Sequence, residues 1–256
     1  MNPTTSQKTL KPDALVTTRW SLIFSAGDSK GEERQVRAAL AELCRIYWRP
    51  VLSFIARRGY SLHDAEDLTQ DFFVRILNGT WLQKADPSRG RFRSLLLKSV
   101  QNFLNDAADR TKARKRGGDV TVVSWDAWSG EAALQSTPAT EPPISWSAER
   151  VFDAYWAATL VERAFRRLRE ECESKGRLRV FERLSPFLTA DRDNVSYANL
   201  ATTLHLPEAT VKKLLYHIRQ RYRFLLRDEV AKTVARGSHV DDELRYLCSV
   251  LAATSA

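Results

Sequence analysis

Aspartates at helical spacing are the most distinctive polar feature of the chain. Asp64, Asp67 and Asp71 stand at i, i+3 and i+7 in the segment LHDAEDLTQDFFVRIL, so a helix there would place their carboxylates on one face. Such a face can pair with nearby arginines, bind a metal ion, or meet a basic protein surface. Carboxylates spread along a stripe do not converge on one point, so we expect no metal site. We assign the face to a basic protein partner, with a solvated face paired to Arg57, Arg58 or Arg75 as the alternative.

A run of cations ends the next amphipathic segment, RGRFRSLLLKSVQNFLNDAADRTKARKRGG. Its apolar face is Phe92, Leu96, Val100, Phe103 and Ala107, and its final cations are Arg110, Lys112, Arg114, Lys115 and Arg116. Cations are favourable near any helix C-terminus. Cations beside amides such as Asn102 and Asn105 are also typical of proteins that bind phosphates and base edges.

A helix-turn-helix pattern occupies Tyr197–Arg223. Pro207 and Glu208 are typical of a helix start, and the following apolar positions are Val211, Leu214, Leu215, Ile218 and Tyr222. The residues expected to face outward are Thr210, Lys212, Lys213, Tyr216, His217 and Arg219. Two helices with a short turn and a basic outer face fit a DNA major groove. An ordinary helical hairpin with a solvated surface has a similar pattern.

Helices must position these residues, because strand signals are scarce. Apolar periodicity predicts helices over Glu32–Arg58, Ser61–Leu77 and Arg91–Arg114, and Pro50 should kink or divide the first of them. A mainly helical region follows over Arg150–Arg236. The tail carries one more apolar stripe, which we expect to close the last domain's core; a regulatory or partner-binding helix is the alternative. The stripe consists of Val240, Leu244, Leu247 and Leu251.

A change of composition separates the two helical regions. Between Gly117 and Glu149 there is no lysine or arginine, several residues are acidic, and proline, serine and threonine are frequent. This composition predicts an extended linker. Its apolar residues, parts of which we expect to dock, are Val122, Val123, Trp125, Trp128 and Trp146.

Composition narrows the class of protein further. The formal net charge of +9 favours a polyanionic partner. The three cysteines, Cys44, Cys172 and Cys248, are too scattered for a zinc site or a disulfide framework, and we expect buried thiols. No stretch has the length of a membrane span or a secretory apolar core, so the sequence predicts a cytoplasmic protein without membrane insertion.

The order of these parts resembles bacterial RNA polymerase sigma factors of the two-domain extracytoplasmic-function (ECF) type, in the sigma-70 family. DAEDLTQDFFVRIL is the most specific motif, followed by the basic helix, the acidic linker and the helix-turn-helix. The resemblance covers Arg19–Arg116 and Ala148–Val234.

The resemblance implies an all-α fold of two helical domains joined by the linker. It divides the chain into an N-terminal extension at 1–18, sigma region 2 at 19–116, the linker at 117–149, sigma region 4 at 150–236 and a tail at 237–256. It implies a non-catalytic protein without a cofactor or metal. Its partners would be promoter DNA and the clamp helices of the largest subunit of core RNA polymerase, and an anti-sigma factor or other regulator is a further candidate.

The resemblance also assigns roles to residues. The polymerase contact would use Asp64, Glu66, Asp67, Gln70 and Asp71. Opening and reading of the promoter −10 element would use Asn102, Asn105, Asp106, Arg110, Lys112, Arg114 and Lys115. The −35 element would be read by Thr210, Lys212, Lys213, Tyr216, His217 and Arg219. The chain departs from the usual family pattern at Leu95, Gln101, His205, Leu214 and His217.

Two other functions compete with this interpretation. A helix-turn-helix repressor or activator could act without polymerase, but it would not need the acidic face. A nuclease or recombinase could use the acids with a metal, but the carboxylates do not converge as such a site requires.

Overall fold

The computed structural model describes residues 30–78, 91–114, 142–191, 194–234 and 239–254. All regular elements in this part of the chain are helical, which confirms the all-α prediction there. The helices are α2 (Lys30–Arg57), α3 (Leu62–Asn78), α4 (Phe92–Arg114), α5 (Ala148–Ser174), α6 (Leu178–Leu184), α7 (Tyr197–Leu204), α8 (Glu208–Ala231) and α9 (Val240–Thr254), with a short 3-10 helix at Ser185–Phe187. None of them is both long and apolar enough to cross a membrane.

Helices α2, α3 and α4 form a bundle around aromatic side chains. Phe54, Phe73 and Phe103 are buried in it, one from each helix. The sequence predicted a kink or a division at Pro50. The division is wrong, because α2 runs through this residue as a single helix. Tyr47 and Val51 are buried on either side of the proline, and their packing outweighs the one backbone hydrogen bond that proline removes.

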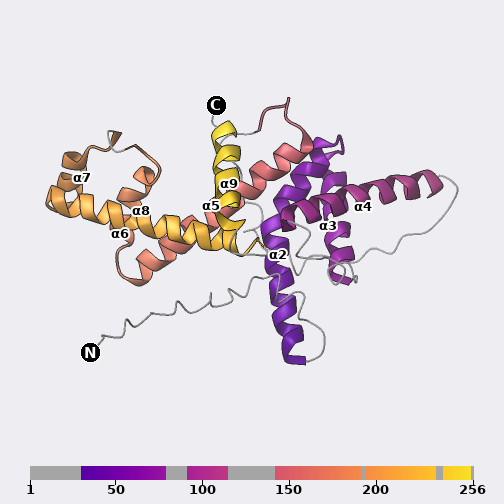
Figure 1. The fold of residues 1–256 in the computed structure, drawn as a ribbon, viewed down its shortest axis with the longest axis horizontal. Helices are drawn as coiled ribbons and strands as arrows, with labels where there is room; N and C mark the ends of the chain where they lie inside the picture. The colour runs from indigo at the N-terminus through magenta and orange to yellow at the C-terminus, as the bar shows by residue number, and fades with distance from the viewer. Residues whose placement is uncertain (1–29, 79–90, 115–141, 192–193, 235–238, 255–256) are drawn as a thin grey trace, which may run out of the picture.

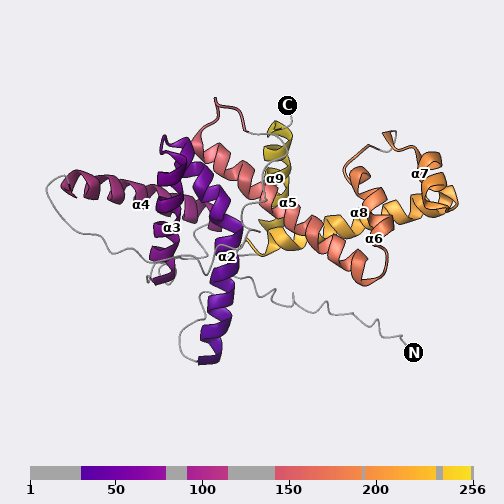
Figure 2. The same cartoon turned by 180° about the vertical axis from the view of Figure 1, so that it is seen from behind.

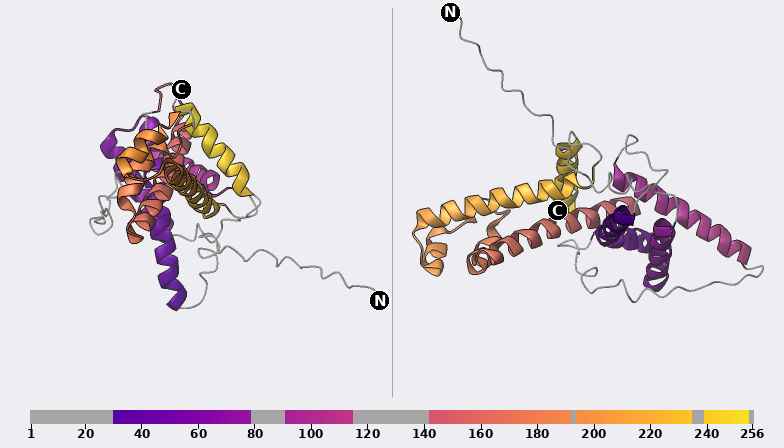
Figure 3. Two further views of the ribbon diagram at one scale, coloured as in Figure 1. Left: turned by 90° about the vertical axis from the view of Figure 1, so that its left-hand side faces the viewer. Right: turned by 90° about the horizontal axis from the view of Figure 1, so that it is seen from below.

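The long helix α5 connects this bundle to the helix-turn-helix. Phe152 and Trp156, in its first half, lie in the same core as α2, whereas Ala164 and Leu168 pack with Tyr222 of α8. Figures 1 and 3 show α5 and α8 running side by side between the two ends of the molecule. The predicted division at 117–149 therefore does not separate two cores, because the start of α5 belongs to the α2–α4 core.

Helix α9 completes the same core. Val240, Leu247 and Val250 are buried in it, so the prediction of a core-facing stripe is confirmed. Helix α9 packs chiefly against α5 and α8, as expected for the core of the last domain, and this core is continuous with that of α2–α4. Apolar periodicity shows which face of a helix is buried but not which neighbour covers it.

A buried polar cluster fixes α9 to α4 and α5. The guanidinium of Arg93 donates to Glu243 at 2.5 Å and to Asp153 at 2.6 Å, and the Tyr246 hydroxyl donates to Asp153 at 2.6 Å. Arg93 also lies over the Tyr246 ring, 4.1 Å from its centroid. Each buried charge thus has a partner of opposite sign, which the low-polarity surroundings require.

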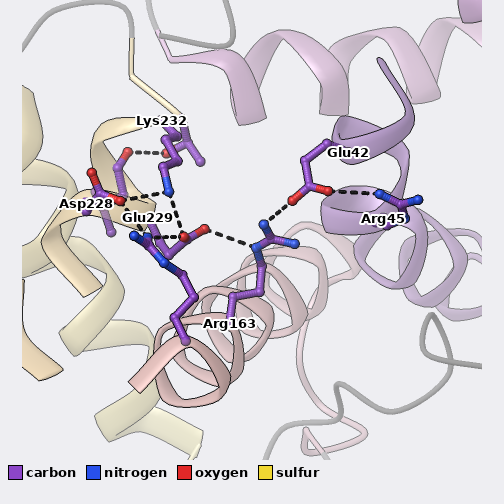
Figure 4. Close-up of polar contacts among 9 residues, drawn as sticks. Glu42, Arg45, Arg163, Asp228, Glu229 and Lys232 are labelled. Atoms are coloured by element: carbon purple, nitrogen blue, oxygen red, sulfur yellow. Dashed lines mark hydrogen bonds and ion pairs between the residues drawn. The ribbon is translucent and has the colours of Figure 1, made fainter. Parts of the chain in front are cut away.

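A second charge cluster joins α2, α5 and α8 (Figure 4). Arg163 of α5 pairs with Glu42 of α2 and donates to Glu229 of α8 at 3.0 Å. The Lys232 ammonium lies 2.8 Å from the Glu229 carboxylate. The Arg167 guanidinium lies 2.6 Å from the same carboxylate. Burial alone would raise the pKa of Glu229, but Lys232 and Arg163 outweigh it and lower this pKa to about 2.

The cysteines differ from expectation. Cys44 is buried, and burial raises the pKa of its thiol to about 12. Cys172 is half-buried and Cys248 is exposed, so the prediction of buried thiols is wrong for them.

Glu229→Gln should reduce the pH dependence of stability in acid. The pKa of Glu229 is 4.5 without the fold and about 2 within it, so its ion pairs stabilise the protein fully above pH 4.5 and are lost as the pH falls toward 2. At about 1.4 kcal/mol per pH unit, the contribution is about 3 kcal/mol. Denaturant unfolding at several pH values measures it. Asp241→Asn, in the exposed pair with Arg227, is the control, and an equal change in that variant would contradict the assignment.

Leu247→Ala should destabilise the whole molecule by about 2–5 kcal/mol, because Leu247 is fully buried where α9 completes the core. Denaturant unfolding followed by tryptophan fluorescence measures this, since Trp156 lies in the same core. Arg245→Ala on the same helix should change stability by less than about 1 kcal/mol, because its pair with Asp242 is exposed. Equal stability of the two variants would show that α9 is not part of the core.

Candidate functional site

The acidic face of α3 is exposed over its whole length. Glu66, Asp67 and Asp71 lie in solvent, and Gln70 is half-buried. Asp64 is also exposed but has a local role: its backbone N–H donates to the Ser61 hydroxyl, which donates back to the Asp64 carboxylate at 2.6 Å. This reciprocal pair caps the helix start.

The arginines that could have neutralised this face are used elsewhere. Arg57 donates to the backbone carbonyls of Pro142 and Pro143, at 3.1 and 2.7 Å, and Arg58 lies over the Phe54 ring. Within the described residues, the ion pair recorded on the face is His63 with Asp67, 3.8 Å apart. His63 and Asp67 are one helical turn apart on α3. The face keeps most of its negative charge.

A hollow of about 450 Å³ lies between α3 and α4. It is lined by Phe72, Arg75, Ile76, Ser99, Asn102, Phe103, Asn105 and Asp106. Phe72, Ile76 and Phe103 supply apolar surface, and Asn102, Asn105 and Asp106 are exposed on α4. The structure thus brings together the three non-cationic residues that the sequence assigned to the −10 element.

Arg75 extends across the space between the two helices. Its guanidinium donates to Asp106 at 3.0 Å and lies 5.9 Å from the centre of the Phe103 ring. Sequence reasoning considered Arg75 only as a partner for the aspartates and did not consider Ser99. The spacing in the sequence could have revealed the position of Arg75, because Phe72 and Arg75 stand at i and i+3 on α3 and therefore share one face.

The cations predicted to bind phosphates lie at the far end of α4. Figure 2 shows this helix extending past α3 toward its C-terminus at Arg114. The side chains of Arg110, Lys112 and Arg114, and all of Lys115, lie outside the described residues. So do the apolar linker residues Val122, Val123, Trp125 and Trp128. Trp146 is described, and its burial in the α2–α4 core confirms docking of that part of the linker.

The second helix of the helix-turn-helix presents most of its predicted residues to solvent. Lys213, Tyr216 and His217 are exposed. Lys212 is exposed too, but it pairs with Glu208 at 2.7 Å. Thr210 is half-buried. Sequence reasoning missed Gln220 and Arg223, which are exposed further along α8 and continue the same helical face.

The expectation that Arg219 faces outward is wrong. Its guanidinium donates to the carbonyl of Phe187 at 2.7 and 3.1 Å and to that of Ala190 at 2.6 Å. The Phe187 carbonyl ends the short 3-10 helix and the Ala190 carbonyl lies just beyond it, and both need donors because no further helical turn supplies them. Arg219 therefore holds the loop before α7 against α8.

A left-handed residue forms the turn between α7 and α8. His205 has φ 53° and ψ 43°. Its N–H donates to the Thr202 carbonyl, and the Leu206 N–H donates to the Ala201 carbonyl, as in a Schellman motif. This turn sets the direction in which α8 leaves α7. Glycine is the residue best suited to this backbone conformation.

Comparison with known proteins identifies the family. Residues 43–114, which span α3, α4 and the second half of α2, match Sigma-70 region 2. The chain is also 26% identical over 187 residues to "RNA polymerase sigma factor YlaC" of Bacillus subtilis (strain 168), an alignment that covers 73% of this chain and 98% of that protein. Residues 43–114 thus resemble sigma-70 region 2, and the two matches together support an ECF-type sigma factor of the sigma-70 family.

This sigma factor therefore belongs to the proteins of transcription initiation. The acidic face and the hollow both lie within its matched region 2. No solved structure gives a significant match.

Substitution at His205 should test the turn. His205→Gly should stabilise the sigma factor by up to about 1 kcal/mol, because glycine adopts positive φ without steric cost. His205→Val should destabilise it by at least about 1 kcal/mol, since a β-branched side chain is disfavoured there. Thermal unfolding ranks the three proteins. A valine variant as stable as the glycine variant would show that the positive φ is not required.

Proposed function

We propose that this sigma factor binds core RNA polymerase through the acidic face of α3 and directs it to specific promoters. The observation that carries the proposal is the position of the hollow, beside a helix with an exposed and largely unneutralised carboxylate face. Helices α3 and α4 together could then contact the polymerase and hold promoter DNA next to it.

The polymerase contact is supported by charge and by apolar exposure. Glu66, Asp67 and Asp71 suit a basic protein surface, and Leu62, 64% exposed at the start of the same helix but on another side of it, could add apolar contact at the edge. Charge complementarity orients a partner, while an apolar contact adds affinity. We assign this surface to the clamp helices of the largest polymerase subunit.

The hollow suits one unpaired base of the −10 element. Phe72 and Phe103 meet edge to face at its wall, with ring centres 5.5 Å apart. Both rings are almost wholly buried, so a base in the hollow would contact only their exposed edges, while its polar edge can reach the amides of Asn102 and Asn105. The cations at the end of α4 would hold the neighbouring phosphates.

Helix α8 would read the −35 element in the major groove. Lys213, Tyr216 and His217 are exposed near its start, where recognition helices contact bases. Arg223 lies further along the helix and suits the phosphate backbone. Arg219 contributes by fixing the preceding loop.

Run-off transcription with core polymerase should test this function. The protein with Asp67→Arg and Asp71→Arg should lose promoter-dependent transcripts by at least about tenfold, because two repulsive charges are placed at the proposed polymerase contact. Glu170→Arg with Glu173→Arg is the matched control: it changes net charge equally on an exposed part of α5, away from α3.

The control should retain activity close to that of the unaltered protein. Equal activity of the two double variants would overturn the polymerase contact. Absence of promoter-dependent transcripts with the unaltered protein would overturn the function itself.

A further inference from the structure

An ion pair occupies the start of α8, the helix proposed to enter the major groove. Glu208 is the first residue of this helix, and Lys212 stands one turn later with its ammonium 2.7 Å from the Glu208 carboxylate. Both side chains are about half exposed. The Lys212 ammonium also lies 5.2 Å from the centre of the Tyr197 ring on α7. Helix α7 therefore helps to hold the pair in place.

The carboxylate of Glu208 stands out on a surface that would approach DNA. Phosphates repel it, and its pairing with Lys212 withdraws one cation from the phosphate backbone. In the major groove, however, a carboxylate accepts a hydrogen bond from the exocyclic amine of cytosine, and a lysine donates to O6 and N7 of guanine. The first residues of a recognition helix are those that reach base edges. Glu208 and Lys212 thus combine the chemistry and the position needed to read bases.

A G·C base pair presents atoms that match both members of the ion pair. Guanine O6 and the cytosine N4 amine are joined by a hydrogen bond in the base pair, so these two atoms lie about 2.9 Å apart. The Lys212 ammonium and the Glu208 carboxylate are separated by a similar distance, 2.7 Å. The ammonium can donate to O6 while the carboxylate accepts from N4, and the ion pair need not break.

The other base pairs fit these two charges less well. In an A·T pair, a carboxylate that accepts from N6 of adenine also faces the N7 acceptor of the same base. The ammonium would then meet thymine, which offers one acceptor, O4, beside a methyl group. Reversal of either base pair sets the carboxylate against an acceptor oxygen. Both charges are satisfied only by G·C with its cytosine toward Glu208.

We propose that Glu208 and Lys212 together read one G·C pair of the −35 element, with Glu208 specifying the cytosine. Sequence reasoning assigned Lys212 to this element but not Glu208. This role of Glu208 rests on the proposed function, because α8 must enter the major groove for the ion pair to meet a base.

Selection from a pool of promoters tests this role of Glu208. A promoter that gives transcripts in the run-off assay is randomised over its −35 element, and the fragments bound by core polymerase with the full-length chain are sequenced. The unaltered protein should enrich a G·C pair at one position. Glu208→Ala should lower that preference by about tenfold, the usual order for one good contact to a base, and leave the other positions unchanged.

The conservative variant Glu208→Gln should also relax the choice at that position, because an amide donates as well as accepts and so tolerates an acceptor where the carboxylate does not. Glu162→Ala is the matched control. Glu162 pairs with Arg166 across one turn of α5, so this variant loses the same charge and the same type of ion pair away from α8. It should select the same promoters as the unaltered protein, and thermal unfolding checks that all three variants remain folded.

Absolute affinities separate base reading from a simple effect of charge. Loss of an acidic side chain near DNA reduces repulsion and strengthens binding to every sequence. Loss of a base contact instead weakens binding to the selected promoter alone. Glu208→Ala should therefore bind the selected promoter more weakly and unrelated DNA no more weakly than the unaltered protein does. Tighter binding to both, with unchanged sequence preference, overturns the inference.

Failure of the proposed function has a different signature. If the −35 preferences of the unaltered protein survive in Glu208→Ala, Tyr216→Ala and His217→Ala alike, α8 does not read this element. If Tyr216→Ala or His217→Ala changes the preferences and Glu208→Ala does not, the −35 role of α8 stands and base reading by Glu208 fails. A Glu208-dependent position that selects a pair other than G·C also overturns the inference.

Discussion

The buried carboxylate of Glu229 constrains how the helices of this sigma factor can pack. A buried charge without partners costs several kcal/mol, so Glu229 must meet Arg163 and Lys232 in the folded state. Arg163 in turn pairs with Glu42, and three helices from distant parts of the chain are held in one register. Apolar packing alone would tolerate a shift of one helix along another, whereas this set of charges does not.

This register links the two surfaces proposed to meet DNA. The hollow lies at one end of the molecule, and the start of α8 lies at the other (Figure 1). Helices α5 and α8 pack against each other between them, and both contribute to the core that contains α2 and α4. Specificity can therefore reside in exposed side chains at the two ends, while buried residues fix their separation.

Much of the fold could be predicted from periodicity. The apolar spacing located α3 and α4 to within one residue, because one buried face repeats every turn. It also located the start of α8, but that helix continues to Ala231, beyond the predicted end at Arg223. The partner of each face could not be predicted in this way. The stripe of α9 does not reveal that Leu247 is covered by the α2–α5 core, and a boundary drawn from composition at 117–149 missed the shared core.

The candidate site shows the same limit for charged residues. Residue type identified Asn102, Asn105 and Asp106, which do line one hollow. It could not distinguish Lys213, which is exposed, from Arg219, whose guanidinium binds loop carbonyls. A long cationic side chain can extend into solvent or donate to backbone carbonyls. The backbone groups within its reach decide which of the two it does.

The burial of α9 also sets an order of events during synthesis. Arg93 belongs to the region 2 half, yet one of its two buried carboxylate partners, Glu243, is in the last helix. The emerging chain thus exposes the apolar surface that Leu247 later covers, and this surface stays open until α9 has left the ribosome. A polypeptide that stops short of α9 would retain the region 2 sequence with an incomplete core, and the apolar surface left open would make it more susceptible to proteolysis than the folded protein.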